Sequence, residues 1–215
     1  MLQIEKFVCN MIQENCYVVS DETKECVIID CGAFYPEERK SLVSYIRDNG
    51  LTLTHLLATH GHLDHNFGID TIYNEFGTKL EINAADEFLV ATINEQSEEF
   101  LGVNPHINVP PIGPYISGGD TVSFGSHNFS VIPTPGHSPG GVVFYCKEEQ
   151  VAFSGDTLFR MSIGRTDFPY SNWAHMQQSL NLLSTTLAPP TTVWPGHGPS
   201  TLMADEMSMN PYLRR

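Results

Sequence analysis

The chain has 215 residues, of which 41% are hydrophobic and 17% are charged, and its formal net charge is −14. These fractions are typical of a folded globular protein and differ from those of a disordered chain. The acidic excess and the lack of lysine-rich, arginine-rich or membrane-length apolar runs argue against nucleic-acid and membrane partners.

The length predicts one domain over residues 1–215, large enough to bury a hydrophobic core. The first residues lack the basic and apolar regions of a secretion signal. The cysteines are odd in number and form no C-x-x-C pair, which indicates reduced, mostly buried thiols and a cytoplasmic protein. They are Cys9, Cys16, Cys26, Cys31 and Cys146.

The first half of the chain is predicted to begin with β-sheet and to continue with helices and strands. Short runs rich in Val, Ile, Tyr and Cys, separated by polar turns, indicate the first strands. Apolar residues on one helical face, followed by glycine, indicate the helices. The expected elements are strands over 4–9, 16–20 and 26–30, a helix over 37–48, a strand over 53–58, a helix over 66–76, a strand over 79–82 and a helix over 84–101.

Residues 103–119 are rich in proline and glycine and are too long and broken for a simple connection. Two interpretations remain open: a flap over an active site, or a surface crossover between two halves of the fold.

The second half is predicted to repeat a strand-rich stretch followed by helix. Strands are expected over 121–124, 128–132, 141–146, 150–153 and 192–194, with an irregular segment after Asp156. Ser171 is a candidate cap for a helix that runs through Leu187, and a short helix is expected over 202–207. Two sheets packed together with helices outside, an α+β fold, explain this order.

The densest cluster of reactive side chains follows the strand over 53–58, where residues 59–65 are Thr-His-Gly-His-Leu-Asp-His. If the chain leaves the strand extended, His60, His62 and Asp64 point to one side. His65 joins them if a helix begins near Asp64. Imidazole and carboxylate ligands suit zinc, iron or manganese, so the cluster predicts a metal site.

Three further candidates stand beside glycine, each where a predicted strand runs into a loop. They are His137, Asp156 and His197. With the first cluster they supply seven ligands from four loops, which fits two metal ions, a shared carboxylate and a bridging solvent molecule.

These motifs, in this order, resemble the metallo-β-lactamase superfamily over nearly the whole chain. The resemblance implies a four-layer αββα sandwich and two divalent metal ions, with Asp156 as the bridge and Asp30 as a support of the site. It implies that the first ion is held by His60, His62, His137 and Asp156. It implies that the second is held by Asp64, His65, His197 and Asp156.

Within the superfamily the chain most resembles glyoxalase II, the hydroxyacylglutathione hydrolases, through residues 15–17, 59–65 and 155–159. It resembles the short branch that lacks the helical C-terminal domain for glutathione. Where the family has Lys-Phe-Tyr, this chain has Arg165-Thr166-Asp167. Arg165 is therefore the expected contact for a carboxylate of the thiol carrier.

The implied reaction is hydrolysis of a small-molecule thioester, such as S-lactoylglutathione, by a metal-bridging hydroxide that Asp64 orients. Zinc is the expected metal, with iron or manganese as alternatives. Two other functions remain open. A mononuclear iron persulfide dioxygenase shares the Gly-Arg-Thr-Asp-Phe run at 164–168, and a non-catalytic metal-binding protein would share the fold. The thiol carrier and the oligomeric state are also open.

Overall fold

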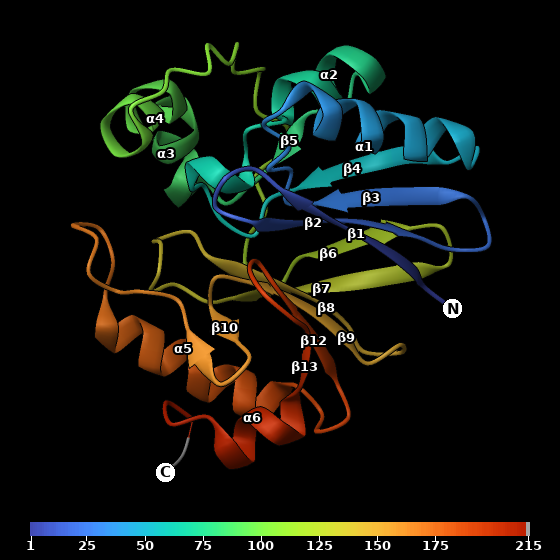
Figure 1. Cartoon of the computed structure of the whole chain (residues 1–215). Coiled ribbons are helices and arrows are strands. Elements are labelled where there is room, and N and C mark those ends of the chain that lie inside the picture. Colours follow the sequence, from blue (N-terminus) through green and yellow to red (C-terminus); the bar gives the residue numbers. More distant parts are fainter. Residues whose placement is uncertain (214–215) are drawn as a thin grey trace.

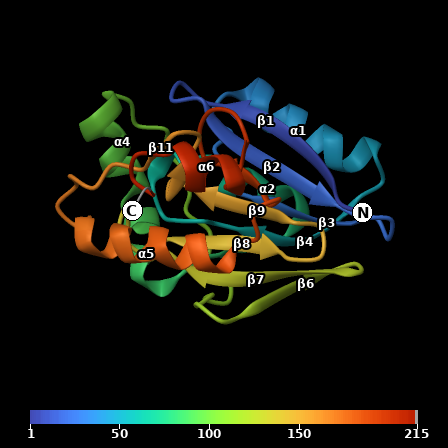
Figure 2. The same ribbon diagram turned by 90° about the horizontal axis from the view of Figure 1, so that it is seen from below.

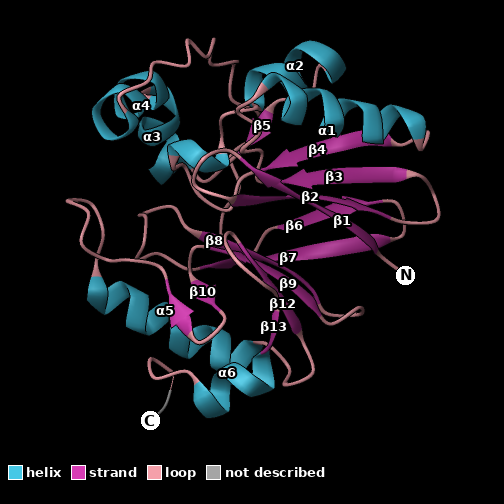
Figure 3. Ribbon diagram, viewed as in Figure 1, coloured by secondary structure: helices cyan, strands magenta, loops and turns pink. Residues whose placement is uncertain are grey.

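A computed structural model describes residues 1–213. Two β-sheets lie face to face, and helices cover the outer side of each (Figure 1). Figure 3 shows the same four layers as helix, strand, strand and helix. The predicted α+β architecture, an αββα sandwich, is confirmed.

The first sheet is antiparallel from β1 to β3 and parallel from β3 to β5. Its strands are β1 (Gln3–Cys9), β2 (Glu14–Ser20), β3 (Glu25–Ile29), β4 (Thr52–Leu57) and β5 (Leu80–Glu81). The helices of this half are α1 (Pro36–Asp48), α2 (Ile69–Phe76), α3 (Glu87–Ala91) and α4 (Ile93–Leu101).

The second sheet carries α5 (Trp173–Thr186) and α6 (Met203–Met209) on its outer face, which Figure 2 shows from below. Its strands, in spatial order, are β13 (Thr201–Leu202), β12 (Thr192–Pro195), β9 (Val151–Gly155), β8 (Val142–Cys146), β7 (His127–Pro133) and β6 (Thr121–Phe124). A separate hairpin joins β10 (Leu158–Phe159) to β11 (Ser162–Ile163).

Alternation along the central strands explains why both sheets are covered on both faces. In β2, Cys16 and Val18 pack toward the helices of the first half, whereas Tyr17 and Val19 pack against the second sheet. Successive strand residues point to opposite faces, so a strand with apolar residues on both faces needs an apolar layer on each side of the sheet. The result is three hydrophobic cores between four layers.

Two of the predicted helices differ from those observed. The prediction of a single helix over 84–101 is wrong, because this segment forms a 3₁₀ turn followed by two helices, α3 and α4, which are separated at Thr92. The Thr92 hydroxyl donates to the carbonyl of Phe88, an alternative to the regular helical pattern that threonine commonly adopts. The helix over 66–76 starts later, at Ile69, because the Asn66 side chain instead donates to two carbonyls of the preceding loop.

The second half also holds features that the sequence pattern did not predict. Asn172, not Ser171, caps α5, since its side chain accepts from the amide of His175. The hairpin of β10 and β11 lies in the stretch expected to be irregular, and the two-residue strand β13 was missed.

Residues 103–119 form an irregular crossover that is tied to the first sheet. The amide of Gly113 donates to the carbonyl of Leu80, and Ile107 is buried in the core under the helices. None of these residues lines the main pocket described below. This arrangement favours the crossover over the flap.

Within the described residues, no helix is long and apolar enough to cross a membrane.

Candidate metal centre

The candidate ligands meet because several strands end at the same edge of the sandwich. In the first sheet, β3 and β4 are parallel, so Asp30 and the 59–65 loop emerge side by side. In the second sheet, β7, β9 and β12 run in one direction. The loops that follow them carry His137, Asp156 and His197. The ligands therefore come from both sheets.

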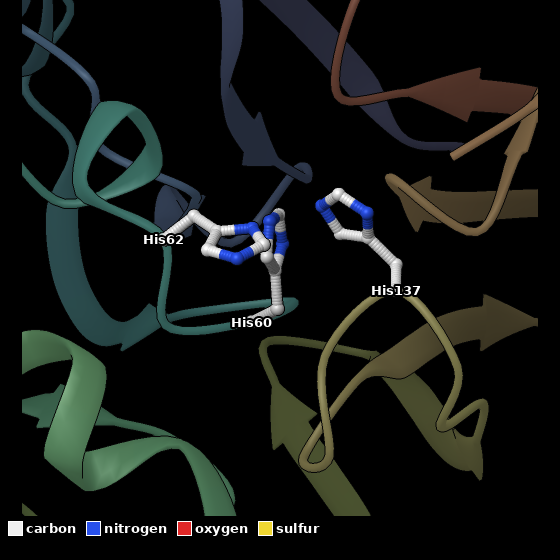
Figure 4. Close-up of side chains that lie close together, drawn as sticks. All are labelled: His60, His62 and His137. Atoms are coloured by element: carbon white, nitrogen blue, oxygen red, sulfur yellow. The ribbon is translucent and has the colours of Figure 1, made fainter. Parts of the chain in front are cut away.

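A first cluster joins His60 and His62 to His137 across the gap between the sheets. One ligand atom of each lies within 4.8 Å of the others. The ring centroids are 4.5 to 5.0 Å apart, and the three side chains point toward one another (Figure 4). Three converging imidazoles are a familiar divalent metal arrangement.

A second cluster consists of Asp64, His65 and His197, again within 4.8 Å. The Nε2 atom of His197 is 3.2 Å from Oδ2 of Asp64, and that of His65 is 3.6 Å from the same oxygen. Simple alternation would put Asp64 beside His60 and His62. The 3₁₀ turn at Leu63–His65 ends that alternation and brings Asp64 and His65 together with His197 instead.

Asp156 lies between the two clusters. Its Oδ1 atom is 3.4 Å from Nε2 of His65, and its Oδ2 atom is 3.4 Å from Nε2 of His137. The same Oδ2 is 3.7 Å from Nε2 of His197. One carboxylate thus reaches both groups of ligands, as a bridging residue must.

Hydrogen bonds fix the outer nitrogen of each histidine and leave the other nitrogen for the centre. The Nδ1 atom of His65 bonds to the Asp30 carboxylate at 2.9 Å, and that of His137 to the Arg165 carbonyl at 2.8 Å. His60 bonds through Nδ1 to the Thr59 hydroxyl. Two further pairs complete the pattern: His197 Nδ1 with the Gln13 carbonyl, and His62 Nε2 with the Tyr170 hydroxyl.

Asp30, predicted as a support of the site, lies directly behind the candidate ligand His65. Besides His65, its carboxylate accepts from the amide and the hydroxyl of Thr59, at 2.7 and 2.8 Å. It therefore holds the first residue of the loop and one of the candidate ligands at once.

Around His60, His62, Asp64 and Asp156 the cluster favours the protonation states that metal ligands need, whereas around His65 it favours the charged imidazole. Burial, followed by the neighbouring histidines, lowers the pKa of His60 well below its usual value and that of His62 to about 3. Burial opposes ionisation of Asp64 and Asp156, but His65 and the other imidazoles outweigh it and lower both pKa values. Burial also opposes charge on His65, yet the surrounding carboxylates raise its pKa.

Orphaned atoms at the centre test whether a metal suits these residues. Among the described residues, no hydrogen-bond partner reaches Nε2 of His60, His65 or His137, or Oδ1 of Asp156, although all four atoms are buried. Buried polar atoms are rarely left unpaired, so these nitrogen and oxygen lone pairs require an electron-pair acceptor. Divalent cations supply that partner, and the imidazole and carboxylate donors fit them.

Asp86 is a supporting residue that the sequence pattern did not indicate. It is fully buried and accepts from the amides of Gly61, at 2.9 Å, and Gly140, at 2.6 Å. It thus ties the loop that carries His60 to the loop that carries His137. A Cβ atom at Gly61 would lie 2.6 Å from the Asp86 carbonyl, so this packing accounts for the glycine.

A pocket of about 720 Å³ opens onto the cluster and is lined by His62, Asp64, His137, Asp156 and His197. Its outer wall is mainly apolar: Ile12, Phe100, Leu101, Phe159, Ile163 and Phe168. Arg165 and Tyr170 add polar groups. Arg165 faces the pocket, but its guanidinium binds both oxygens of Asp167 at 2.6 and 2.8 Å and stacks on Phe168.

Comparisons with known proteins agree with this architecture. The family model described as the metallo-beta-lactamase superfamily matches residues 10–197. Hydroxyacylglutathione hydrolase GloC of Haemophilus influenzae is 34% identical over 213 residues, which cover 99% of this chain and 98% of that protein.

Solved structures extend the similarity to the whole fold. The crystal structure of the BLEG-1 B3 metallo-beta-lactamase has a TM-score of 0.89 and 32% identity, covering 99% of this chain and all of that one. That of TTHA1623 in a di-iron-bound form has a TM-score of 0.86 and 33% identity, covering 97% and 100%. The fold, the family match and these relatives together establish that the chain belongs to the metallo-beta-lactamase superfamily.

Proposed function

We propose that this protein is a metal-dependent hydrolase of the glyoxalase II type, which cleaves a small-molecule thioester such as S-lactoylglutathione or a related acyl-thiol. One observation supports this most strongly: Asp156 reaches two histidine-rich clusters at the floor of an open pocket. The similarity to a hydroxyacylglutathione hydrolase supports the choice of thioester.

In this proposal the clusters hold two divalent ions, zinc first, with iron or manganese as alternatives. The first ion takes His60, His62, His137 and Asp156. The second takes Asp64, His65, His197 and Asp156. The di-iron-bound form of the relative TTHA1623 supports iron as an alternative.

When bound, such ions supply a hydroxide at neutral pH and polarise the substrate carbonyl. The protein's own groups do the rest. Asp64 orients the hydroxide, Asp30 and Asp86 hold the ligand loops in place, and the apolar wall packs against the acyl group. Arg165 is the proposed contact for a carboxylate on the thiol carrier. The proposal takes residues 1–215 as one domain of a cytoplasmic protein, which fits the five free, buried cysteines.

Hydrolysis of S-lactoylglutathione and of an uncharged thioester, with metal content measured on the same sample, tests the proposal. We expect two ions per chain and turnover that falls at least about 1,000-fold in Asp156→Ala, since the bridging ligand is lost. Circular dichroism of the variant should stay native-like.

Other outcomes would overturn this function. One iron per chain, oxygen uptake and consumption of glutathione persulfide would instead identify a persulfide dioxygenase. Metal without turnover of any of these substrates would identify a binding protein.

A further inference from the structure

Tyr170 places a hydroxyl group beside the first cluster, at the pocket wall. Its oxygen is 2.8 Å from Nε2 of His62. Within residues 1–213 this is the single hydrogen bond of the hydroxyl, so one further bond remains available to it. A phenolic hydroxyl can donate one hydrogen bond and accept others.

The direction of the bond follows from the role proposed for His62. Nε2 faces Tyr170, so Nδ1 is the nitrogen left to bind an ion, and a neutral imidazole that binds through Nδ1 carries its proton on Nε2. His62 therefore donates to the tyrosine oxygen. The hydrogen of Tyr170 then has no acceptor among the described residues and is free to point into the pocket.

Aromatic neighbours hold the ring in this position. Phe168 stacks on Tyr170 with centroids 5.6 Å apart and planes 15° apart, and Phe88 meets the ring edge-on at 5.6 Å. Because a phenol keeps its proton at physiological pH, the Tyr170 hydroxyl is a neutral donor. The hydroxyl is thus oriented before any substrate arrives.

We propose that the Tyr170 hydroxyl donates a hydrogen bond to the carbonyl oxygen of the bound thioester. This hydrogen bond becomes stronger as negative charge develops on that oxygen. This inference rests on the proposed thioester hydrolysis. No covalent bond to Tyr170 forms or breaks, and the proton stays on the phenol. Donors oriented toward a developing oxyanion commonly contribute a factor of about 100 or more to kcat.

Tyr170→Phe tests the inference, because it removes the hydroxyl and keeps the ring between Phe168 and Phe88. With the thioester that the wild-type protein hydrolyses faster, we expect kcat to fall about 100-fold or more and KM to change less than about threefold. Metal content should equal that of the wild type. Tyr212→Phe, which removes an exposed hydroxyl beside Trp173, is the matched control and should keep full activity.

A binding measurement supplies a readout independent of turnover. Calorimetry would compare a ketone analogue of S-lactoylglutathione, with methylene in place of sulfur, with S-propylglutathione, which has no acyl carbonyl. Wild-type protein should prefer the ketone, and Tyr170→Phe should show a smaller preference.

Two results would overturn the role of Tyr170. If the variant keeps wild-type kcat and ketone preference, the hydroxyl does not touch the carbonyl. If metal content falls in parallel with kcat, Tyr170 only positions His62. A wild-type protein that is loaded with metal but inactive on both thioesters would instead refute the proposed function.

Discussion

At the scale of single residues, Arg165 is the one lysine or arginine among the described residues that line the pocket. Asp167 already binds its guanidinium through both oxygens, so the pair presents no net charge to an incoming anion. Both side chains are more than half exposed, which makes the pair weak and open to competition by a substrate carboxylate. Asp167 therefore weakens the attraction of Arg165 for a negatively charged thiol carrier.

If Arg165 contacts the thiol carrier, Asp167→Ala should release the guanidinium and lower KM for S-lactoylglutathione about threefold, as expected for an exposed ion pair. KM for the uncharged thioester should not change. Steady-state kinetics on both substrates measures the ratio. The double variant Arg165→Met with Asp167→Ala is the control and should lose the gain; an equal effect on both substrates would contradict the role of Arg165.

At the scale of elements, strand ends were predictable and turns were not. Apolar runs located β3, β4, β7, β9 and β12, and the loops after the last four carry the seven candidate ligands, which lie at one edge. The 3₁₀ turn that separates Asp64 from His60 is held by segments distant in sequence, since the Asn10 side chain donates to the carbonyl of Asp64 and the Cys31 amide to that of His65. Asp86 and Tyr170 were missed for the same reason, since each acts through a loop remote in sequence.

A polar clamp joins the two sheets at the end opposite the metal centre. Glu14 begins β2 near His197, whereas Asp21 follows the far end of that strand. The Asp21 carboxylate accepts from Nδ1 of His127 at 2.8 Å, and Nε2 of His127 is 3.1 Å from Glu149. Burial opposes charge on His127, but these two carboxylates outweigh it and raise its pKa.

This clamp predicts a pH-dependent contribution to stability. Because the pKa of His127 is higher in the folded than in the unfolded state, the stabilisation is complete below about pH 6.5 and is lost as pH rises through the folded value. His127→Gln should reduce the free energy of unfolding by about 1 kcal/mol more at pH 5.5 than at pH 9. Urea unfolding at both values measures this, and an equal loss at both would refute an ionic contribution.

At the scale of the whole molecule, the two candidate ions would join two halves that also meet through an apolar core and through the His127 clamp. The core between the sheets is built from Tyr17, Phe129, Phe144 and other buried side chains. The ligands at its edge come from both sides, with His60 from the first sheet and His137 from the second. Metal occupancy should therefore affect the stability of the whole fold as well as its chemistry.

Removal of metal with a chelator should lower the thermal midpoint. One ion present at about 1,000 times its dissociation constant stabilises a folded protein by about 4 kcal/mol, which corresponds to a shift of about 8–16 °C for a chain of this size, and two independent ions would give about twice that shift. Calorimetry before and after chelation, and after zinc is restored, measures the shift. His127→Gln should show the same shift as the wild type because its clamp lies at the far end of the sheets, whereas Asp156→Ala should show a smaller one. An unchanged midpoint after verified metal loss would mean that the ions do not hold the halves together.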